Sequence, residues 1–188
     1  MAFATLLDTL LIALYYTAPG LIANMIPVFT KKINFLDTPV DFGKSWKGAR
    51  IFGDHKTYKG FFFGIISAIF LVYVQKLLYT FDWLNRISFV DYGSFSYLEV
   101  VWLGFLFGFG ALFGDLIKSY FKRRAGIAPG KSFAPWDQLD YVLGIIVFVS
   151  LYKPVTLVMA FMLVIVAPML HLITTIIGYN LGLKEEKW

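Results

Sequence analysis

The chain is 188 residues long, carries a formal net charge of +5 and is 59% hydrophobic. Soluble domains are usually about 45–50% apolar, so this composition, with a mean hydropathy of +0.70, excludes an ordinary soluble globular protein. There is no cysteine, which excludes disulfides and thiolate metal sites, and the two histidines, His55 and His171, are too few for a zinc centre built on imidazole.

Five apolar segments follow one another along the chain, at about residues 4–29, 60–80, 98–120, 138–152 and 154–178. Each is a candidate to cross the hydrocarbon core of a bilayer, which is roughly 30 Å thick. The first contains Pro19, Gly20 and Pro27 but lacks the basic leader of a secretory signal peptide. The fourth is short, so it is either a half-helix or a tilted span. The sequence therefore predicts an all-α, polytopic integral membrane protein with about five transmembrane helices.

Lysine and arginine are concentrated in the connections 30–59 and 121–137 and in the C-terminal tail. The other side of the expected membrane keeps Lys76, Arg86 and Lys153. Because basic residues are enriched in cytoplasmic loops, we expect the N-terminus outside and the C-terminus in the cytoplasm. We expect residues 1–188 to form a single domain in the cell membrane, with 30–59 and 121–137 as cytoplasmic loops. This basic face suits lipid headgroups and nucleotides, and no nucleic-acid partner is expected for such short juxtamembrane loops.

The third apolar segment carries two pairs of glycines at small-xxx-small spacing, Gly104 with Gly108 and Gly110 with Gly114. Such pairs let a neighbouring helix approach closely. Packing against another helix of the same chain is the simpler interpretation. A contact between two subunits, and hence a homodimer, is the alternative.

Charged residues are gathered where the third segment ends and the fourth begins. Asp115, Lys118 and Lys122 share one face of a helix, because they are three and seven residues apart. Asp137 and Asp140 have the same three-residue spacing. Charges beside apolar helices indicate a functional site, and carboxylates can bind Mg²⁺ while the cations bind phosphate. The simpler interpretation is that Asp115 pairs with a neighbouring lysine and that the other two acids stabilise a helix N-terminus.

A second group lies between Gly53 and Gly60, just before the second apolar segment. A helix N-terminus flanked by lysines is a ready site for an anion, although a solvated basic loop is the alternative. The residues of this group that we expect to bind substrate are Asp54, His55, Lys56, Thr57 and Lys59. Asn24 lies in the first segment, where a helix broken by proline and glycine can line a pocket, and a packed asparagine is equally expected. Lys131 is an ordinary loop lysine that can contact phosphate.

Several of these residues resemble the sequence signature of a known family. Gly114-Asp115, Lys122-Arg123 and the later Pro135, Asp137 and Asp140 resemble the signature of the integral-membrane CDP-diacylglycerol synthases. The chain length, the five apolar segments and the Gly53–Gly60 element resemble the archaeal branch, the CDP-archaeol synthases. One departure is that Phe133-Ala134-Pro135-Trp136 stands where the bacterial and eukaryotic members have His-Gly-Gly. That departure favours the archaeal branch.

The resemblance implies a Mg²⁺-dependent cytidylyltransferase that takes CTP and a membrane lipid phosphate, expected to be 2,3-di-O-geranylgeranylglyceryl phosphate, an isoprenoid glycerol ether lipid. It implies that Asp115, Asp137 and Asp140 bind the metal and that Asp115, Asp137 and Lys122 are catalytic. The substrates would be bound by Asn24, Asp54, His55, Lys56, Thr57, Lys59, Lys118, Arg123 and Lys131. Two other classes remain open from the residues alone: another lipid-phosphate enzyme, such as a lipid kinase or a polyprenyl-phosphate phosphatase, and a small anion transporter.

Overall fold

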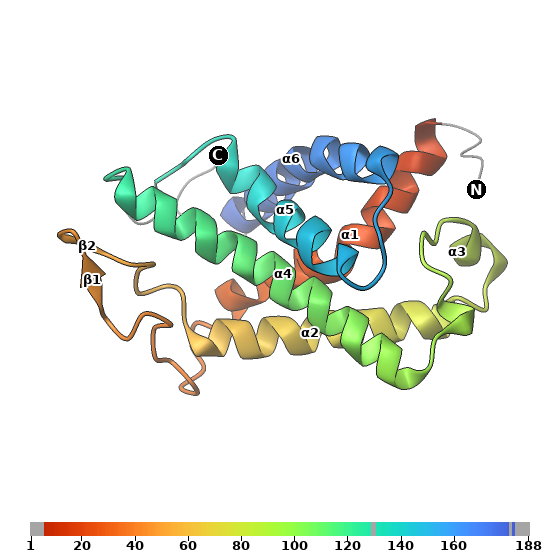
Figure 1. The fold of residues 1–188 in the computed structure, drawn as a ribbon, viewed down its shortest axis with the longest axis horizontal. Coiled ribbons are helices and arrows are strands. Elements are labelled where there is room, and N and C mark those ends of the chain that lie inside the picture. The colour runs from red at the N-terminus through yellow and green to blue at the C-terminus, as the bar shows by residue number, and fades with distance from the viewer. Residues whose placement is uncertain (1–5, 129–130, 181, 183–188) are drawn as a thin grey trace.

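The computed structural model describes residues 6–128, 131–180 and 182. Most of these residues are helical, and the long helices cross one another in a single bundle (Figure 1). In chain order the elements are α1 (Leu6–Phe29), β1 (Ser45–Trp46), β2 (Ala49–Arg50), α2 (Tyr58–Leu78), α3 (Asp82–Arg86), the 3-10 turn η1 (Tyr92–Ser94), α4 (Tyr97–Arg124), α5 (Trp136–Ser150) and α6 (Leu157–Asn180). The predicted all-α class is therefore right apart from one short hairpin.

Four helices of the described chain, α1, α2, α4 and α6, are long and apolar enough to cross a membrane. The expected fourth span, 138–152, corresponds to α5, which has 15 residues and is shorter than the others. Five helices thus follow the predicted order, and four of them satisfy the length of a full span. The protein is a multi-pass membrane protein on this composition and length.

The helix α4 forms the centre of the bundle and packs against α2, α5 and α1. Its buried side chains include Leu103 and Phe107, which are fully enclosed, as is Ile145 of α5. The glycine pairs explain how closely the helices approach. A Cβ on Gly104 or Gly108 would press on the α2 backbone, and one on Gly110 would press on the backbone of α5. Both glycine pairs are therefore used inside the chain, which confirms helix packing as their role.

Helix α4 extends further than the apolar pattern predicted, because it ends at Arg124 rather than near residue 120. Cations in the last turn of a helix are stabilised by its dipole, so the basic run continues the helix instead of ending it. The expected loop 121–137 shrinks accordingly to the connection 125–135. The prediction of a loop beginning at 121 was wrong for this reason.

The large connection 30–59 contains a two-stranded antiparallel hairpin in which Trp46 pairs with Ala49. Its turn residues Lys47 and Gly48 both have positive φ, 50° and 77°, which is the turn that suits the twist of a tight hairpin. The hairpin lies beside the C-terminal end of α4, whereas α3 lies at the opposite end of the molecule (Figure 1). The loop that precedes α2 is thus folded against the bundle.

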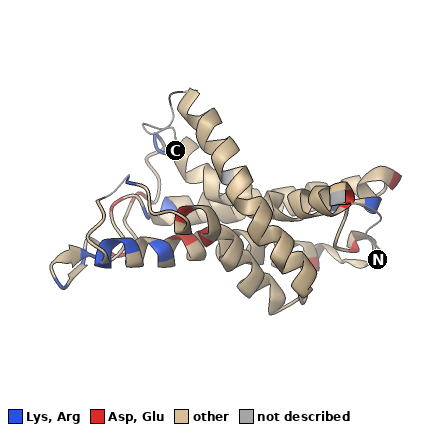
Figure 2. Ribbon diagram, turned by 90° about the horizontal axis from the view of Figure 1, so that it is seen from above, with Lys and Arg blue, Asp and Glu red and all other residues tan. Residues whose placement is uncertain are grey.

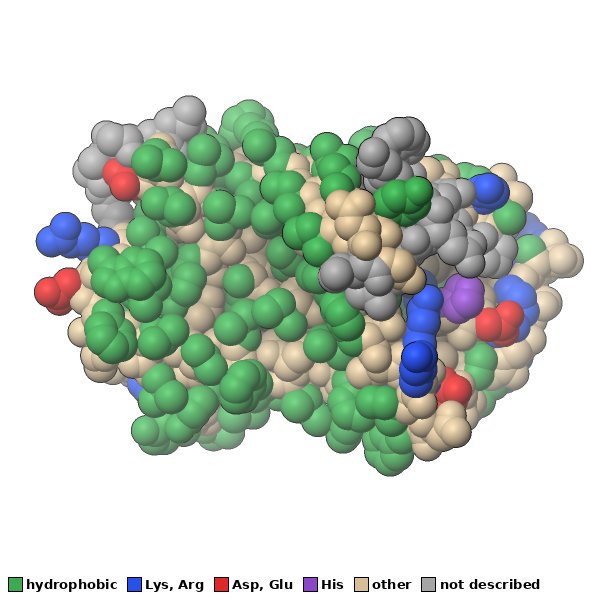
Figure 3. Space-filling model, turned by 180° about the vertical axis from the view of Figure 1, so that it is seen from behind, with side chains coloured by type: hydrophobic (Ala, Val, Ile, Leu, Met, Phe, Trp, Pro, Cys, Tyr) green, Lys and Arg blue, Asp and Glu red, His purple; other side chains and the backbone are tan. Residues whose placement is uncertain are grey.

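Charged residues are concentrated toward the two ends of the molecule, and few lie in the middle of the bundle (Figure 2). Seen from behind, hydrophobic side chains cover most of the central surface (Figure 3). The larger charged end contains the hairpin and the C-terminal turns of α4. This distribution is that of a protein whose middle faces lipid and whose ends face water.

Candidate functional site

The centre of the site is the ammonium group of Lys118, which forms ion pairs with three carboxylates. Its Nζ lies 3.0 Å from Asp115 Oδ1, 3.1 Å from Asp137 Oδ1 and 2.6 Å from Asp140 Oδ2. The side chains of Lys118, Asp115 and Asp137 are 14% exposed, and that of Asp140 is 1% exposed. We call these four residues the Lys118 cluster. The structure thus brings together the three acids that the sequence singled out.

Two features of the helices place these side chains together. Spacing by three residues puts Asp115 and Lys118 on one face of α4, and Asp137 and Asp140 on one face of α5. The two faces then meet because Gly114 packs directly on the backbone of Asp140, where a Cβ would collide with the Asp140 carbonyl oxygen. A glycine next to Asp115 is therefore what allows both helices to bring their acids to one point.

Two further cations border the cluster. Lys56, from the loop before α2, forms an ion pair with Asp115 Oδ2. Lys122, one turn beyond Lys118 on α4, lies 3.5 Å from Asp137 Oδ2 and is itself buried. Three carboxylates are thus compensated by three ammonium groups. Buried charges require such pairing, since an unpaired one would be strongly destabilising.

The carboxylate oxygens of Asp137 and Asp140 differ in their hydrogen-bond partners. One oxygen of Asp137 accepts a hydrogen bond from the backbone N–H of Phe133, as expected of an acid at a helix N-terminus. Asp140 Oδ1 accepts from the backbone N–H of Tyr141 at 2.6 Å. Asp140 Oδ2 is buried and accepts no hydrogen bond of regular geometry from the described residues, although Lys118 is close. The partner of this oxygen is thus the Lys118 ammonium, at 2.6 Å.

The chemistry of these donors fits a hard divalent cation, which prefers carboxylate oxygens. Their spacing is wider than a metal needs, because the oxygens lie 2.6–3.1 Å from Lys118 Nζ, whereas Mg²⁺ binds oxygen at about 2.1 Å. Within the described residues, accordingly, no group of three His, Cys, Asp or Glu side chains is arranged to hold a metal as it stands. Asp115, Asp137 and Asp140 could bind one after a small contraction toward the point that the ammonium now occupies.

The loop 30–59 is organised by a buried aspartate that the sequence analysis did not identify. Asp41 Oδ1 accepts a hydrogen bond from Arg50 at 2.6 Å, and Arg50 also pairs with Asp54. Asp41 further accepts from the backbone N–H groups of Gly43, Phe52 and Gly53. Burial alone would raise the pKa of the Asp41 carboxyl, but these hydrogen bonds prevail and lower its pKa to about 2.

Arg124, at the end of α4, fastens the hairpin to the bundle. Its guanidinium donates to the carbonyl oxygens of Trp46, Ala49 and Arg50 and lies over the rings of Trp46 and Tyr120. A planar guanidinium suits such a fork of acceptors. Neither Asp41 nor Arg124 carried a motif that revealed its partner. The sequence signal for Asp41 was the turn pattern Asp41-Phe42-Gly43, in which an acid stands two residues before a glycine.

Among the residues predicted between Gly53 and Gly60, Lys56 alone contacts the cluster. Thr57 begins α2 as its N-cap, where its side chain accepts from the backbone N–H of Gly60 at 3.2 Å. His55 is exposed and has no contact with Asp115 or the other acids. The anion site expected at this helix N-terminus is therefore reduced to one lysine that reaches into the bundle.

Lys59 is directed elsewhere. Its ammonium is buried and binds Asp37 Oδ1 at 2.6 Å and the carbonyl oxygens of Lys31 and Ile33 at 3.3 and 2.9 Å. These contacts connect the end of α1 to the start of α2. Lys59 thus stabilises the loop rather than facing the Lys118 cluster.

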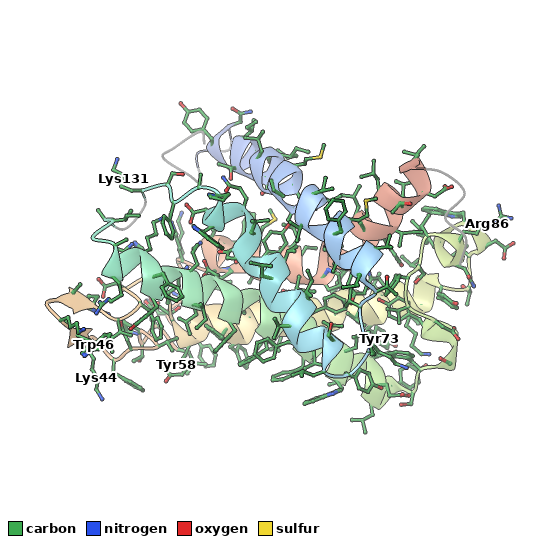
Figure 4. The ribbon with its side chains drawn as sticks, turned by 45° about the horizontal axis from the view of Figure 1, so that its top comes forward. Lys44, Trp46, Tyr58, Tyr73, Arg86 and Lys131 are labelled. Atoms are coloured by element: carbon green, nitrogen blue, oxygen red, sulfur yellow. The ribbon has the colours of Figure 1, made fainter. Side chains whose placement is uncertain are left out.

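The other predicted residues lie around the same end of the molecule. Asn24 is half-buried in α1, one turn before Pro27, which packs against Gly60. Lys131 is exposed, and Figure 4 shows it at the end that also holds Lys44 and Trp46, far from Arg86.

Arg123 lines a surface hollow of about 360 Å³ together with Trp46, Lys47, Ala49 and Arg124. Among the described residues, no carboxylate forms an ion pair with Arg123. Nine residues separate Asp115 from Arg124, and at 3.6 residues per turn they lie on opposite sides of α4. This basic hollow is therefore distinct from the Lys118 cluster and does not contain the acids.

Apolar helices surrounding a buried ionic cluster near one end define an integral membrane protein with a charged site buried between its helices. A family model described as CarS-like, CDP-archaeol synthase, matches residues 6–188. The chain therefore belongs to the CDP-archaeol synthase family, and with it to the lipid-synthesising enzymes.

Individual relatives agree with this assignment. The chain is 38% identical over 158 residues to the CDP-archaeol synthase of Methanococcoides burtonii, covering 80% of this chain and 90% of the relative. It is 34% identical over 177 residues to that of Methanocaldococcus jannaschii, covering 94% and 96%. A solved structure described as an intramembrane enzyme for archaeal membrane lipid biosynthesis is 28% identical, with a TM-score of 0.66, and covers 87% of this chain and 92% of its own.

Proposed function

We propose that this chain transfers the cytidylyl group of CTP to an isoprenoid glycerol ether lipid phosphate, giving CDP-archaeol and pyrophosphate, with Mg²⁺ as cofactor. Family membership supports the reaction, and one observation supports the location. Three buried carboxylates converge on Lys118 between α4 and α5, and Lys56 and Lys122 border them. The expected lipid is 2,3-di-O-geranylgeranylglyceryl phosphate. Family membership also disfavours the alternatives of a lipid kinase, a phosphatase and an anion transporter.

The reaction needs charge neutralisation more than a strong base. An oxygen of the lipid phosphate attacks the α-phosphorus of CTP, and the bond from that phosphorus to the pyrophosphate oxygen breaks. A phosphate monoester has a second pKa near 6, so the nucleophile is already largely deprotonated at neutral pH. The obstacle is the approach of one anion to another, which cationic groups placed in advance lower.

The residues of the cluster divide between two tasks in this proposal. Asp115, Asp137 and Asp140 would hold Mg²⁺, which supplies positive charge to the reacting phosphates when bound. Lys122 and Lys56 carry ammonium groups at the edge of the cluster, where they can bind phosphate oxygens and orient them for in-line attack. Lys122 is the proposed catalytic cation because it is buried next to Asp137.

The surrounding residues have supporting parts in substrate binding. Lys131, Arg123 and His55 would meet the triphosphate or the base as the substrates enter from the water side. Asn24 would border the lipid phosphate within the bundle. Asp54, Thr57 and Lys59 act on substrate indirectly in this proposal, since each already stabilises the loop that carries Lys56.

The basic end of the molecule is proposed to face the cytoplasm, which places the N-terminus outside and the C-terminus inside. In this arrangement α5 counts as a fifth membrane segment, and residues 1–188 act as one domain. CTP then reaches the cluster from the cytosol, and the lipid reaches it sideways from the inner leaflet. A homodimer stays a prediction that neither glycine pair supports, since both face helices of the same chain.

The assay uses purified protein, CTP, Mg²⁺ and a phosphorylated dialkylglycerol, and it measures both CDP-lipid and pyrophosphate. Asp115→Asn should lower turnover at least about 100-fold, because it removes charge from a preorganised site. Asp82→Asn is the control, since Asp82 is an exposed acid on α3 at the far end of the bundle. Near-normal turnover by Asp115→Asn would refute the metal assignment. Equal use of other nucleoside triphosphates with release of nucleoside diphosphate would identify a kinase instead.

A further inference from the structure

Lys118 occupies the place where the three carboxylates converge. Its Nζ lies within 3.1 Å of an oxygen from each of Asp115, Asp137 and Asp140, and no other cation of the described chain contacts all three. The arrangement is buried, because the lysine side chain is 14% exposed and that of Asp140 is 1% exposed. The Lys118 ammonium thus pairs with all three acids, and Lys56 and Lys122 each pair with one of them.

An ammonium group and a divalent cation cannot occupy this point together. The carboxylates lie on a shell of 2.6–3.1 Å about Nζ, and Mg²⁺ requires oxygens at about 2.1 Å. Contraction of the shell is blocked while the ammonium remains. The acids themselves have little freedom to retreat, because Gly114 and Gly144 hold α4 and α5 backbone to backbone. Lysine is the mobile component, since its charge sits on a flexible four-carbon stem.

We infer that Lys118 is a place-holding residue, whose ammonium is bound by all three carboxylates and is displaced when a divalent cation binds. The inference rests on the proposed function only in taking these acids as the metal ligands. Displacement leaves the lysine free to turn toward Lys122, one helical turn along, where the phosphates are proposed to lie. One side chain would thus stabilise the site before loading and assist anion binding afterwards. It is a positioning residue for the metal and a binding residue for the substrate.

Direct measurement of metal binding tests this idea without relying on turnover. The full chain is purified in detergent without nucleotide and titrated with Mn²⁺, and free Mn²⁺ is followed by electron paramagnetic resonance. Lys118→Met removes the ammonium but keeps the length of the side chain. It should bind Mn²⁺ at least about tenfold more tightly than the unmodified chain, because a competing charge at contact distance has gone.

Two matched variants test whether tighter Mn²⁺ binding comes from removing Lys118 in particular or from losing any positive charge near the acids. Lys56→Met and Lys122→Met each remove a cation that contacts one of the three acids rather than all of them. Each should tighten Mn²⁺ binding by less than about threefold, since the point of convergence stays occupied. Equal tightening in all three variants would overturn the inference, as would unchanged affinity in Lys118→Met.

Lys118→Met leaves the acids without their central partner, so its folding is checked by thermal melting with and without Mn²⁺. Its melting temperature should fall and then recover with Mn²⁺ by more than that of the unmodified chain. Lys118→Gln, which keeps a neutral donor, provides a milder variant with an intermediate Mn²⁺ affinity. If the unmodified chain forms CDP-lipid but Lys118→Met binds Mn²⁺ no more tightly, the place-holding role is refuted and the proposed function is not. Absence of CDP-lipid synthesis in the unmodified chain refutes the proposed function and leaves the Mn²⁺ comparison standing.

Discussion

Asp41 illustrates how a single buried carboxylate can organise a long connection. Its carboxylate accepts hydrogen bonds from Arg50 and from three backbone N–H groups. Because Arg50 belongs to β2, these bonds join the hairpin to the rest of the loop. Hydrogen bonds to the charged form of an acid lower its pKa, which here is about 2. The ionised form of Asp41 therefore contributes to the stability of the folded loop.

The pH dependence of stability follows from that shift. Because the pKa of Asp41 is lower in the folded chain than its ordinary value of 3.8, its contribution is complete above about pH 4 and is lost as the pH falls toward 2. Asp41→Asn should reduce stability by at most about 2 kcal/mol at neutral pH. Thermal melting of both proteins from pH 7 to pH 2 should show the difference narrowing at the acidic end. A difference that grows on acidification would contradict this account.

At the scale of single residues, the sequence predicted members of the site better than their partners. Helical spacing correctly placed Asp115 beside Lys118, because both belong to one element. It could not show that Lys118 reaches Asp137 and Asp140, since that contact depends on how two helices cross. Lys56 and Lys59 are three residues apart and look alike in sequence, yet one contacts Asp115 and the other Asp37. Only the folded loop decides which lysine faces which acid.

At the scale of secondary-structure elements, the site depends on the close contact between helices α4 and α5. Gly110 and Gly114 of α4 meet Gly144 and the Asp140 backbone of α5 without intervening side chains. Gly114→Ala would insert a methyl group against the Asp140 carbonyl oxygen, so the helices must separate there. Because catalytic groups tolerate little displacement, CDP-lipid synthesis should fall at least about 100-fold, beyond what lost stability explains.

Gly104→Ala provides the comparison, because it introduces a similar collision on the same helix, against Ile69 of α2. It should lower the melting temperature comparably while retaining more of the activity at a temperature where both variants are folded. Melting and turnover measured on the same preparations decide between the two effects. Equal losses of activity in both variants would show that general destabilisation, rather than the α4–α5 contact, controls the site.

Element boundaries were harder to predict than element order. The apolar pattern gave the five main helices in sequence, but it ended α4 near residue 120, where lysines and arginines begin. The helix in fact includes Lys122 and Arg124, since basic side chains are favourable at a helix C-terminus. The hairpin was not predicted, because strands of two residues carry too little alternation to be recognised.

At the scale of the whole molecule, the uneven distribution of charge predicts a definite orientation. The chain contains no cysteine, so single cysteines can be introduced one at a time and labelled with a membrane-impermeant maleimide. Lys44→Cys, at an exposed position just before β1, should react only from the cytoplasmic side. Asn85→Cys, exposed on α3 at the opposite end, should react only from outside. The reverse pattern in intact and inverted vesicles would disprove the orientation.

The short length of α5 affects how deep the lipid phosphate would bind. Fifteen residues at 1.5 Å each extend about 22 Å, which is several ångströms less than the roughly 30 Å of hydrocarbon. Just beyond its other end, the Tyr152 hydroxyl donates to Glu99 at the start of α4 at 2.9 Å. In the proposed arrangement the deficit would then fall at the aspartate end. In the proposed arrangement the Lys118 cluster would therefore lie below the plane of the headgroups. A lipid with two long tails could then present its phosphate to the cluster without leaving the leaflet, and the lipid product would remain in the membrane.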